Sequence, residues 1–170
     1  IEVLVEFTEM FQKGFSGFKR FLEVVETKPD IVDAPDAKEL KEVHGVIDYE
    51  DVCFSYNDEE KVLDHIHIHI DAGKSIALVG PSGGGKTTIC SLLPRFYDVT
   101  HGSIKVDGKY IRSLTLESLR KAIGIVQQDV YLFTGSIKEN IAYGKPGASD
   151  EEIIAAAKKA NIHEFIMSLP

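Results

Sequence analysis

A glycine-rich segment at residues 80–88 constrains this chain more than any other part of its 170 residues. The segment reads GPSGGGKTT and fits the pattern G-x-x-x-x-G-K-[ST] at every fixed position. An apolar run, SIALV, precedes it at residues 75–79, and a partly apolar run follows it and ends at Pro94. This order predicts a buried strand, a glycine-rich turn and a short helix.

Such a turn is suited to binding phosphate. Successive glycines allow backbone conformations in which consecutive N–H groups point at one anion, and the helix dipole adds to the attraction. We expect Lys86 to reach the β- and γ-phosphates of a nucleoside triphosphate and the Thr87 hydroxyl to ligate Mg²⁺. A glycine-rich turn with an incidental lysine would leave the flanking strand and helix unexplained. The predicted nucleotide-binding residues of this segment are Gly80, Pro81, Ser82, Gly83, Gly84, Gly85, Lys86, Thr87 and Thr88.

The composition is that of one globular domain, with 44% hydrophobic and 27% charged residues. A formal net charge of −8 argues against nucleic acid as a partner, because contacts to its phosphates need a clustered excess of Lys and Arg. Cys53 and Cys90 have no C-x-x-C spacing, so we expect reduced thiols in a cytosolic compartment. No long apolar run or signal-peptide layout is present, so the visible chain is not expected to span a membrane.

Residues 1–27 have apolar side chains at steps of mostly three and four, which predicts an amphipathic helix. Glu2 and Glu6 exclude it from a bilayer core, whereas Lys19 and Arg20 are typical of a helix that leaves lipid on the cytoplasmic side. A surface helix packed on a core explains the periodicity equally well. The segment that follows contains two prolines and many charges, which predicts a solvated linker.

Two stretches before the glycine-rich segment predict antiparallel, half-exposed strands, residues 46–56 and 65–70. In the second stretch, His65, His67 and His69 share one face. Imidazoles suit Zn²⁺ or Cu²⁺, so a metal site is conceivable. We favour a solvated polar face, because an alternating strand explains the same histidines without a fourth ligand.

Signals after the glycine-rich segment are local. The dipeptide Asp107-Gly108 between two short β-like runs predicts a hairpin. Thr115 is expected to cap a short helix that ends at Lys121. The apolar run at residues 123–126 predicts a second core strand, and Ser149 begins a capping box that starts a further helix.

These motifs, in this order, resemble the nucleotide-binding domain of ATP-binding cassette (ABC) transporters. The resemblance is to exporters, multidrug or lipid exporters among them, whose transmembrane and nucleotide-binding domains share one chain, and it covers residues 46–170. The supporting segments besides the glycine-rich loop are PRFYD at residues 94–98, SLTLESLR at 113–120, IGIVQQDVYLF at 123–133 and GSIKENI at 135–141.

The resemblance implies an α/β fold, a P-loop NTPase (RecA-like) core with an N-terminal antiparallel β-subdomain, preceded by an amphipathic helix. It implies four parts: the cytoplasmic end of a transmembrane helix, a linker, the ATP-binding core with its β-subdomain, and the start of a helical subdomain. Their expected boundaries are residues 1–28, 29–44, 45–147 and 148–170.

Further residue roles are implied by the same resemblance. Tyr56 corresponds to the aromatic residue that stacks on adenine, and Gln128 to the Q-loop glutamine that contacts Mg²⁺ and the attacking water. Lys86 and Gln128 are thus the expected catalytic residues, Thr87 and Gln128 the expected Mg²⁺ ligands, and ATP with Mg²⁺ the expected cofactors. The implied partners are a second nucleotide-binding domain, identical or different, and transmembrane domains at the cytoplasmic face of a cell membrane.

The sequence contains no LSGGQ-like signature, no acidic Walker B strand and no histidine that matches the family's switch histidine. In members of the family, these three motifs come after the position that corresponds to residue 170. The chain is therefore expected to correspond to the first half of a cassette with its entry helix, and to bind ATP without efficient hydrolysis. Two other functions stay open at this point: another P-loop kinase or NTPase, and a non-transport ABC protein that uses ATP as an assembly switch.

Overall fold

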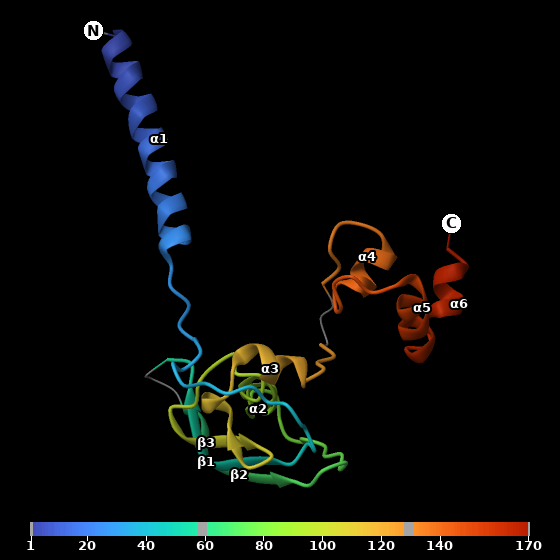
Figure 1. Ribbon diagram of the computed structural model, residues 1–170. Helices are drawn as coiled ribbons and strands as arrows, with labels where there is room; N and C mark the ends of the chain where they lie inside the picture. The colour runs from blue at the N-terminus through green and yellow to red at the C-terminus, as the bar shows by residue number, and fades with distance from the viewer. Residues whose placement is uncertain (1, 58–60, 128–130, 170) are drawn as a thin grey trace. The chain divides into compact units, whose positions relative to one another are not determined.

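The structure is a computed structural model that describes residues 2–57, 61–127 and 131–169 (Figure 1). The chain divides into two compact units, Ile1–Gly124 and Ile125–Pro170. Each unit is described by itself below. The finer domain boundaries expected from the sequence stay predictions.

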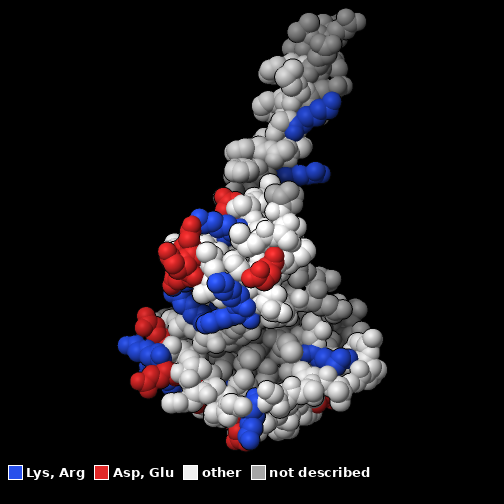
Figure 2. All heavy atoms as spheres, turned by 90° about the vertical axis from the view of Figure 1, so that its right-hand side faces the viewer, with Lys and Arg blue, Asp and Glu red and all other residues white. Residues whose placement is uncertain are grey.

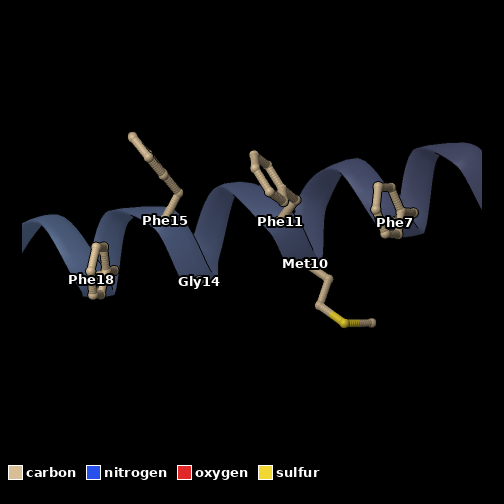
Figure 3. Close-up of a pocket in the computed structure, with 6 residues that line it drawn as sticks. All are labelled: Phe7, Met10, Phe11, Gly14, Phe15 and Phe18. Carbon is tan, nitrogen blue, oxygen red and sulfur yellow. The ribbon is translucent and has the colours of Figure 1, made fainter.

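The predicted N-terminal helix is confirmed as α1, Glu2–Glu26. Its aromatic side chains follow one another along the helix, and the rings of Phe7 and Phe11 are 6.4 Å apart, those of Phe11 and Phe15 6.3 Å. Figure 3 shows these rings with Phe18 and Met10 on α1. Each of these five side chains is more than half exposed, so α1 presents an apolar patch. Among the described residues, none of the helices combines the length and apolar character that crossing a membrane requires.

The first unit contains an antiparallel sheet, as predicted. Its strands are β1 Ile47–Ser55, β2 Lys61–Ile70, β3 His101–Val106 and β4 Lys109–Tyr110, in the order β2-β1-β3-β4. The β3–β4 hairpin turns at Asp107 and Gly108, where φ is 50° and 73°. Positive φ at both positions is what a tight two-residue hairpin needs, and it explains the Asp-Gly dipeptide.

The core lies on one face of this sheet, beneath helices α2, Lys86–Leu92, and α3, Leu116–Lys121 (Figure 1). A short 3-10 helix η1, Ile111–Ser113, connects β4 to α3. Thr115 caps α3 as predicted, since its hydroxyl accepts a hydrogen bond from Ser118 N. The buried apolar cluster consists of Leu40, Tyr49, Val52, Phe54, Leu63, Leu92, Val99, Ile104, Val106, Ile111, Leu114 and Leu119.

The linker after α1 differs from the prediction, because part of it is docked rather than solvated. Leu40 is buried in the core, and Lys38 forms a parallel bridge with Leu114. The Asp107 carboxylate accepts hydrogen bonds from the backbone N–H groups of residues 44–46, at 2.8, 3.0 and 2.9 Å. Burial opposes ionisation of Asp107, but these three donors hold its pKa below the usual value. A backbone bridge, one buried apolar residue and one acceptor on a turn thus all help to dock an otherwise polar segment.

The prediction of two core strands, at residues 75–79 and 123–126, is wrong. Residues 75–79 and 123–126 have no strand pairing among the described residues. Val79 is 89% exposed and Val126 is fully exposed. A parallel strand exists only through hydrogen bonds to neighbouring strands, and no described segment of this chain lies beside either run as a partner.

The second unit consists of short helices, α4 Ile137–Ala142, α5 Asp150–Lys159 and α6 His163–Met167. The predicted capping box at Ser149 is confirmed, with Glu152 as its reciprocal partner. Asn140 holds the preceding loop, since its amide donates to Phe133 O at 3.0 Å and accepts from Phe133 N at 2.8 Å.

Candidate functional site

The glycine-rich loop runs from Gly80 into the first turn of α2. Gly83 and Gly85 have φ of 79° and 78°, in the left-handed region that side chains rarely adopt. Gly84 N donates to Pro81 O at 3.2 Å and closes the turn. The sequence therefore places glycine where the backbone needs it, and the loop leads directly into a helix N-terminus.

Gly85 is also required by a close approach between the loop and β2. A Cβ atom at Gly85 would lie 2.6 Å from the Leu63 side chain and 3.2 Å from Val62 O. The loop end is thus packed against β2, whose residues sequence analysis did not assign to the site.

Lys86, the first residue of α2, extends back over the loop. Its ammonium group donates to Gly80 O at 2.9 Å and to Pro81 O at 2.6 Å. Both acceptors are neutral carbonyls of the loop itself. A phosphate oxygen is a stronger acceptor for an ammonium group because both partners are then charged, so the geometry suits capture of a phosphate beside the loop.

Tyr56 lies just beyond the end of β1, next to the helix that follows the loop. Its hydroxyl is 3.0 Å from the hydroxyl of the buried Thr88. Its ring makes edge contacts with Phe54 and Tyr97, with centroid distances of 4.8 and 5.1 Å. The side chain is nevertheless 51% exposed, so the ring is oriented by its neighbours and keeps a free surface.

These elements line one open cavity of about 420 Å³, which joins the loop to the end of β1. The expected residues Gly83, Gly84, Gly85, Lys86, Thr87 and Thr88 line it together with Tyr56, and so do Lys61 and Val62. The last two were missed because nothing in their local sequence marks them; only the pairing of β2 with β1 brings them here. Gln128 lies outside the described residues.

A buried ion pair fixes the segment that follows α2. Arg95 is 5% exposed, and its Nε atom donates to Asp98 Oδ1 at 2.8 Å. Arg112 approaches the second oxygen of Asp98 at 3.3 Å. Burial alone would raise the pKa of Asp98, but the hydrogen bonds from the two arginines hold it below the usual value. This network positions residues 94–98, the PRFYD segment. Within the described ranges, the structure records no contact between the network and the glycine-rich loop.

Charges of both signs lie on the surface of the protein. Figure 2 shows lysine and arginine side chains interspersed with aspartate and glutamate on the face in view. The ion pairs of the structure include Lys121 with Glu117 and Lys138 with Asp150. The apolar patch on α1 (Figure 3) offers no polar side chain that could bind a nucleotide.

Residues 63–169 match the ABC transporter family. The chain belongs to this family. The match covers the glycine-rich loop and the second unit. It bears out the resemblance stated from the sequence and the P-loop NTPase fold class.

Individual relatives agree with this assignment. The chain is 50% identical over 162 residues to an ABC transporter ATP-binding protein of Bacillus subtilis, YwjA, covering 95% of this chain. It is 45% identical over its full 170 residues to the ATP-dependent lipid A-core flippase of Syntrophus aciditrophicus. Among solved structures, a bacterial Atm1-family ABC exporter with ATP bound has a TM-score of 0.84 and 40% identity over 96% of this chain.

The chain spans 28% of the length of these two relatives and 29% of the solved exporter chain. What it shares with them is the ATP-binding part of exporter-type ABC proteins. The activity, substrate and partners of the whole protein are therefore matters for proposal.

Proposed function

We propose that this chain is the ATP-binding part of an ABC exporter of the multidrug or lipid type. ATP binding closes a dimer of cassettes, hydrolysis reopens it, and the motion drives a substrate across a membrane. The observation that carries the proposal is the cavity in which the glycine-rich loop, Lys86 and Tyr56 meet. A phosphate cradle with an aromatic surface beside it is the arrangement that a nucleoside triphosphate needs.

Each site residue has a distinct role in this proposal. Lys86 neutralises the β- and γ-phosphates, and the loop N–H groups bind the same oxygens. Thr87 ligates Mg²⁺, and Gln128 contacts the ion and the attacking water. The Tyr56 ring stacks on the adenine base; its exposed surface and the fixed position of its hydroxyl support this role.

The partners follow from the same proposal. Phosphoryl transfer depends on positioning and charge neutralisation, and a second cassette, identical or different, completes the site. Transmembrane domains place the protein at the cytoplasmic face of a cell membrane. The apolar patch on α1 supports contact with transmembrane domains, because exposed contiguous apolar surface is typical of an interaction site.

The test uses the purified full-length protein in lipid vesicles. Lys86→Ala should abolish binding of a fluorescent ATP analogue in the presence of Mg²⁺, because the main phosphate-neutralising charge is lost. Lys74→Ala is the matched control, an exposed lysine before the loop. ATP affinity left intact in Lys86→Ala would contradict the proposal.

Gln128→Ala separates binding from turnover. We expect it to retain ATP affinity and to lose ATP hydrolysis and vesicle transport together. The chain by itself should bind ATP and hydrolyse it poorly, because the signature and Walker B motifs are not in its sequence. Efficient hydrolysis by the isolated chain would show that this division of the machinery is wrong.

A further inference from the structure

The outer face of the sheet carries a cluster of ligand-type side chains that the nucleotide site does not use. Val52 pairs with Ile66 and Phe54 pairs with Leu63, so two residues of β2 oppose the single residue Cys53 on β1. This is a β-bulge, and a bulge redirects side chains. Consecutive strand residues normally point to opposite faces, but here both residues opposite Cys53, namely Asp64 and His65, are exposed.

The bulge brings three different donor atoms together. Cys53 Sγ lies 3.8 Å from Asp64 Oδ1, and His65 Nε2 lies 3.9 Å from the same oxygen. In the described part of the chain, these three residues offer ligand atoms within 4.8 Å of one another. Tetrahedral zinc with bonds of about 2.0–2.3 Å needs donor separations of about 3.3–3.6 Å. The two separations from Asp64 Oδ1 therefore exceed this range by a few tenths of an ångström.

Asp51 prepares His65 for coordination. The His65 Nδ1 atom lies 2.7 Å from Asp51 Oδ1. Since a carboxylate only accepts, the neutral ring carries its proton on Nδ1, and its Nε2 lone pair is then available on the side of Asp64. A carboxylate behind a ligating histidine is the usual outer partner in zinc sites. Of the three histidines considered from the sequence, His65 and His67 both contact Asp51. His69 is paired with Asp48 and Asp71 instead, so the structure does not bring all three to one point.

We propose that Cys53, Asp64 and His65 form a binding site for a divalent transition metal of the zinc class. Thiolate, imidazole and carboxylate together match zinc and cobalt rather than Mg²⁺. On binding, the Cys53 thiol releases its proton to solvent and its sulfur bonds to the metal. Water supplies the fourth ligand, since the side chains of Asp64 and His65 are 59% and 62% exposed.

Lys61 is the competitor within the site. Its ammonium group lies 3.0 Å from Asp64 Oδ1, the oxygen that the metal would take. Removing this charge frees the carboxylate, so Lys61→Ala should strengthen metal binding. If the cluster had only a structural role, Lys61→Ala would not be expected to strengthen metal binding.

The experiment is a Co²⁺ titration of the purified full-length protein without nucleotide or Mg²⁺, followed by displacement with Zn²⁺. Thiolate ligation produces a sulfur-to-cobalt charge-transfer absorption. We expect a saturable absorption that Zn²⁺ removes, that Cys53→Ser abolishes and that Cys90→Ser, the matched thiol control, retains. Asp51→Ala should weaken affinity about 10–100-fold, as loss of an outer partner does.

Exposed variants keep the test decisive if Cys53→Ser fails to fold. Asp64→Asn and His65→Asn should each weaken Co²⁺ binding at least tenfold, whereas His69→Ala should not change it. Asn is chosen at position 65 because φ is 49° there and asparagine tolerates this region. A missing charge-transfer absorption in the wild type, or one unchanged in the Asp64 and His65 variants, would overturn the proposal.

Discussion

The hydroxyl of Tyr56 lies 3.0 Å from that of Thr88 and links the end of β1 to the helix that follows the glycine-rich loop. The two residues are 32 positions apart in the sequence. Thr88 is buried and Tyr56 is half exposed. The contact therefore fixes an exposed aromatic ring from a buried point, beside the loop proposed to bind phosphate.

The first prediction separates the ring of Tyr56 from its hydroxyl. Tyr56→Ala should weaken ATP binding by about 1–3 kcal/mol, the usual range for loss of base stacking on an aromatic side chain. Tyr56→Phe keeps the ring and should lose much less. Affinities are measured with a fluorescent ATP analogue, and inorganic tripolyphosphate, which has no base, should bind both variants as it binds the wild type. Equal losses in the two variants would show that stacking is not the role of Tyr56.

The second prediction concerns Gly85, where conformation and space both restrict the residue. Gly85→Ala should abolish or strongly weaken nucleotide binding, because φ is 78° and the new Cβ would meet Leu63. The left-handed conformation alone costs about 1–2 kcal/mol. Gly73→Ala is the control, since φ is 70° there and nothing lies within 4 Å. Affinity is again measured with the fluorescent ATP analogue. A Gly85→Ala protein with wild-type affinity would refute the requirement for glycine at this position.

The third prediction tests the docking of the linker by Asp107. Asp107→Ala removes the acceptor of three backbone N–H groups and should lower the local opening free energy by about 1–3 kcal/mol. Hydrogen exchange of residues 44–46 in the full-length protein, followed by mass spectrometry, reports this opening. Asp107→Asn should be intermediate, because one oxygen still accepts from Gly45 and Val46. Unchanged exchange in Asp107→Ala would mean that the linker is held by other contacts.

The fourth prediction is a pH dependence at His69. Hydrogen bonds with Asp48, and then with Asp71, raise the pKa of His69 above its usual 6.5. The folded protein thus favours the protonated ring, so this stabilisation is complete below about pH 6.5 and is lost as the pH rises through the raised pKa. Because the ring is exposed, the effect is small and weakens with salt.

Hydrogen exchange of β1 and β2 measures this effect directly. The difference in protection between the wild type and His69→Gln, at matched intrinsic exchange rates, should shrink as the pH is raised above neutrality. His163→Gln, in the second unit, is the control. A difference that grows with pH would contradict the assigned direction.

Local signals in the sequence predicted local structure well. The Asp107-Gly108 turn, the Thr115 cap and the Ser149 capping box are all found in the structure. Each depends on residues within four positions of one another, so the chain carries the whole interaction in one segment. The family resemblance, which rests on ordered motifs, is borne out by the comparisons.

Local sequence signals did not predict correctly in every case which segments form strands. The runs at 75–79 and 123–126 have the composition of core strands, but neither pairs within the described chain. The linker shows the opposite error, because Leu40 is buried although its neighbours in sequence are polar. In both cases the outcome depends on a partner surface, which composition does not contain.

By itself, the sequence determined the glycine-rich loop, the helix after it and the hairpin turn at Asp107-Gly108, because backbone conformation there is set by the residues themselves. Only the tertiary structure decided that Tyr56, Lys61 and Val62 share a cavity with that loop. It also decided that a bulge places Asp64 and His65 together opposite Cys53. The physical reason is that strand register and sheet order bring distant residues together, and these follow from packing of the whole domain rather than from any one segment.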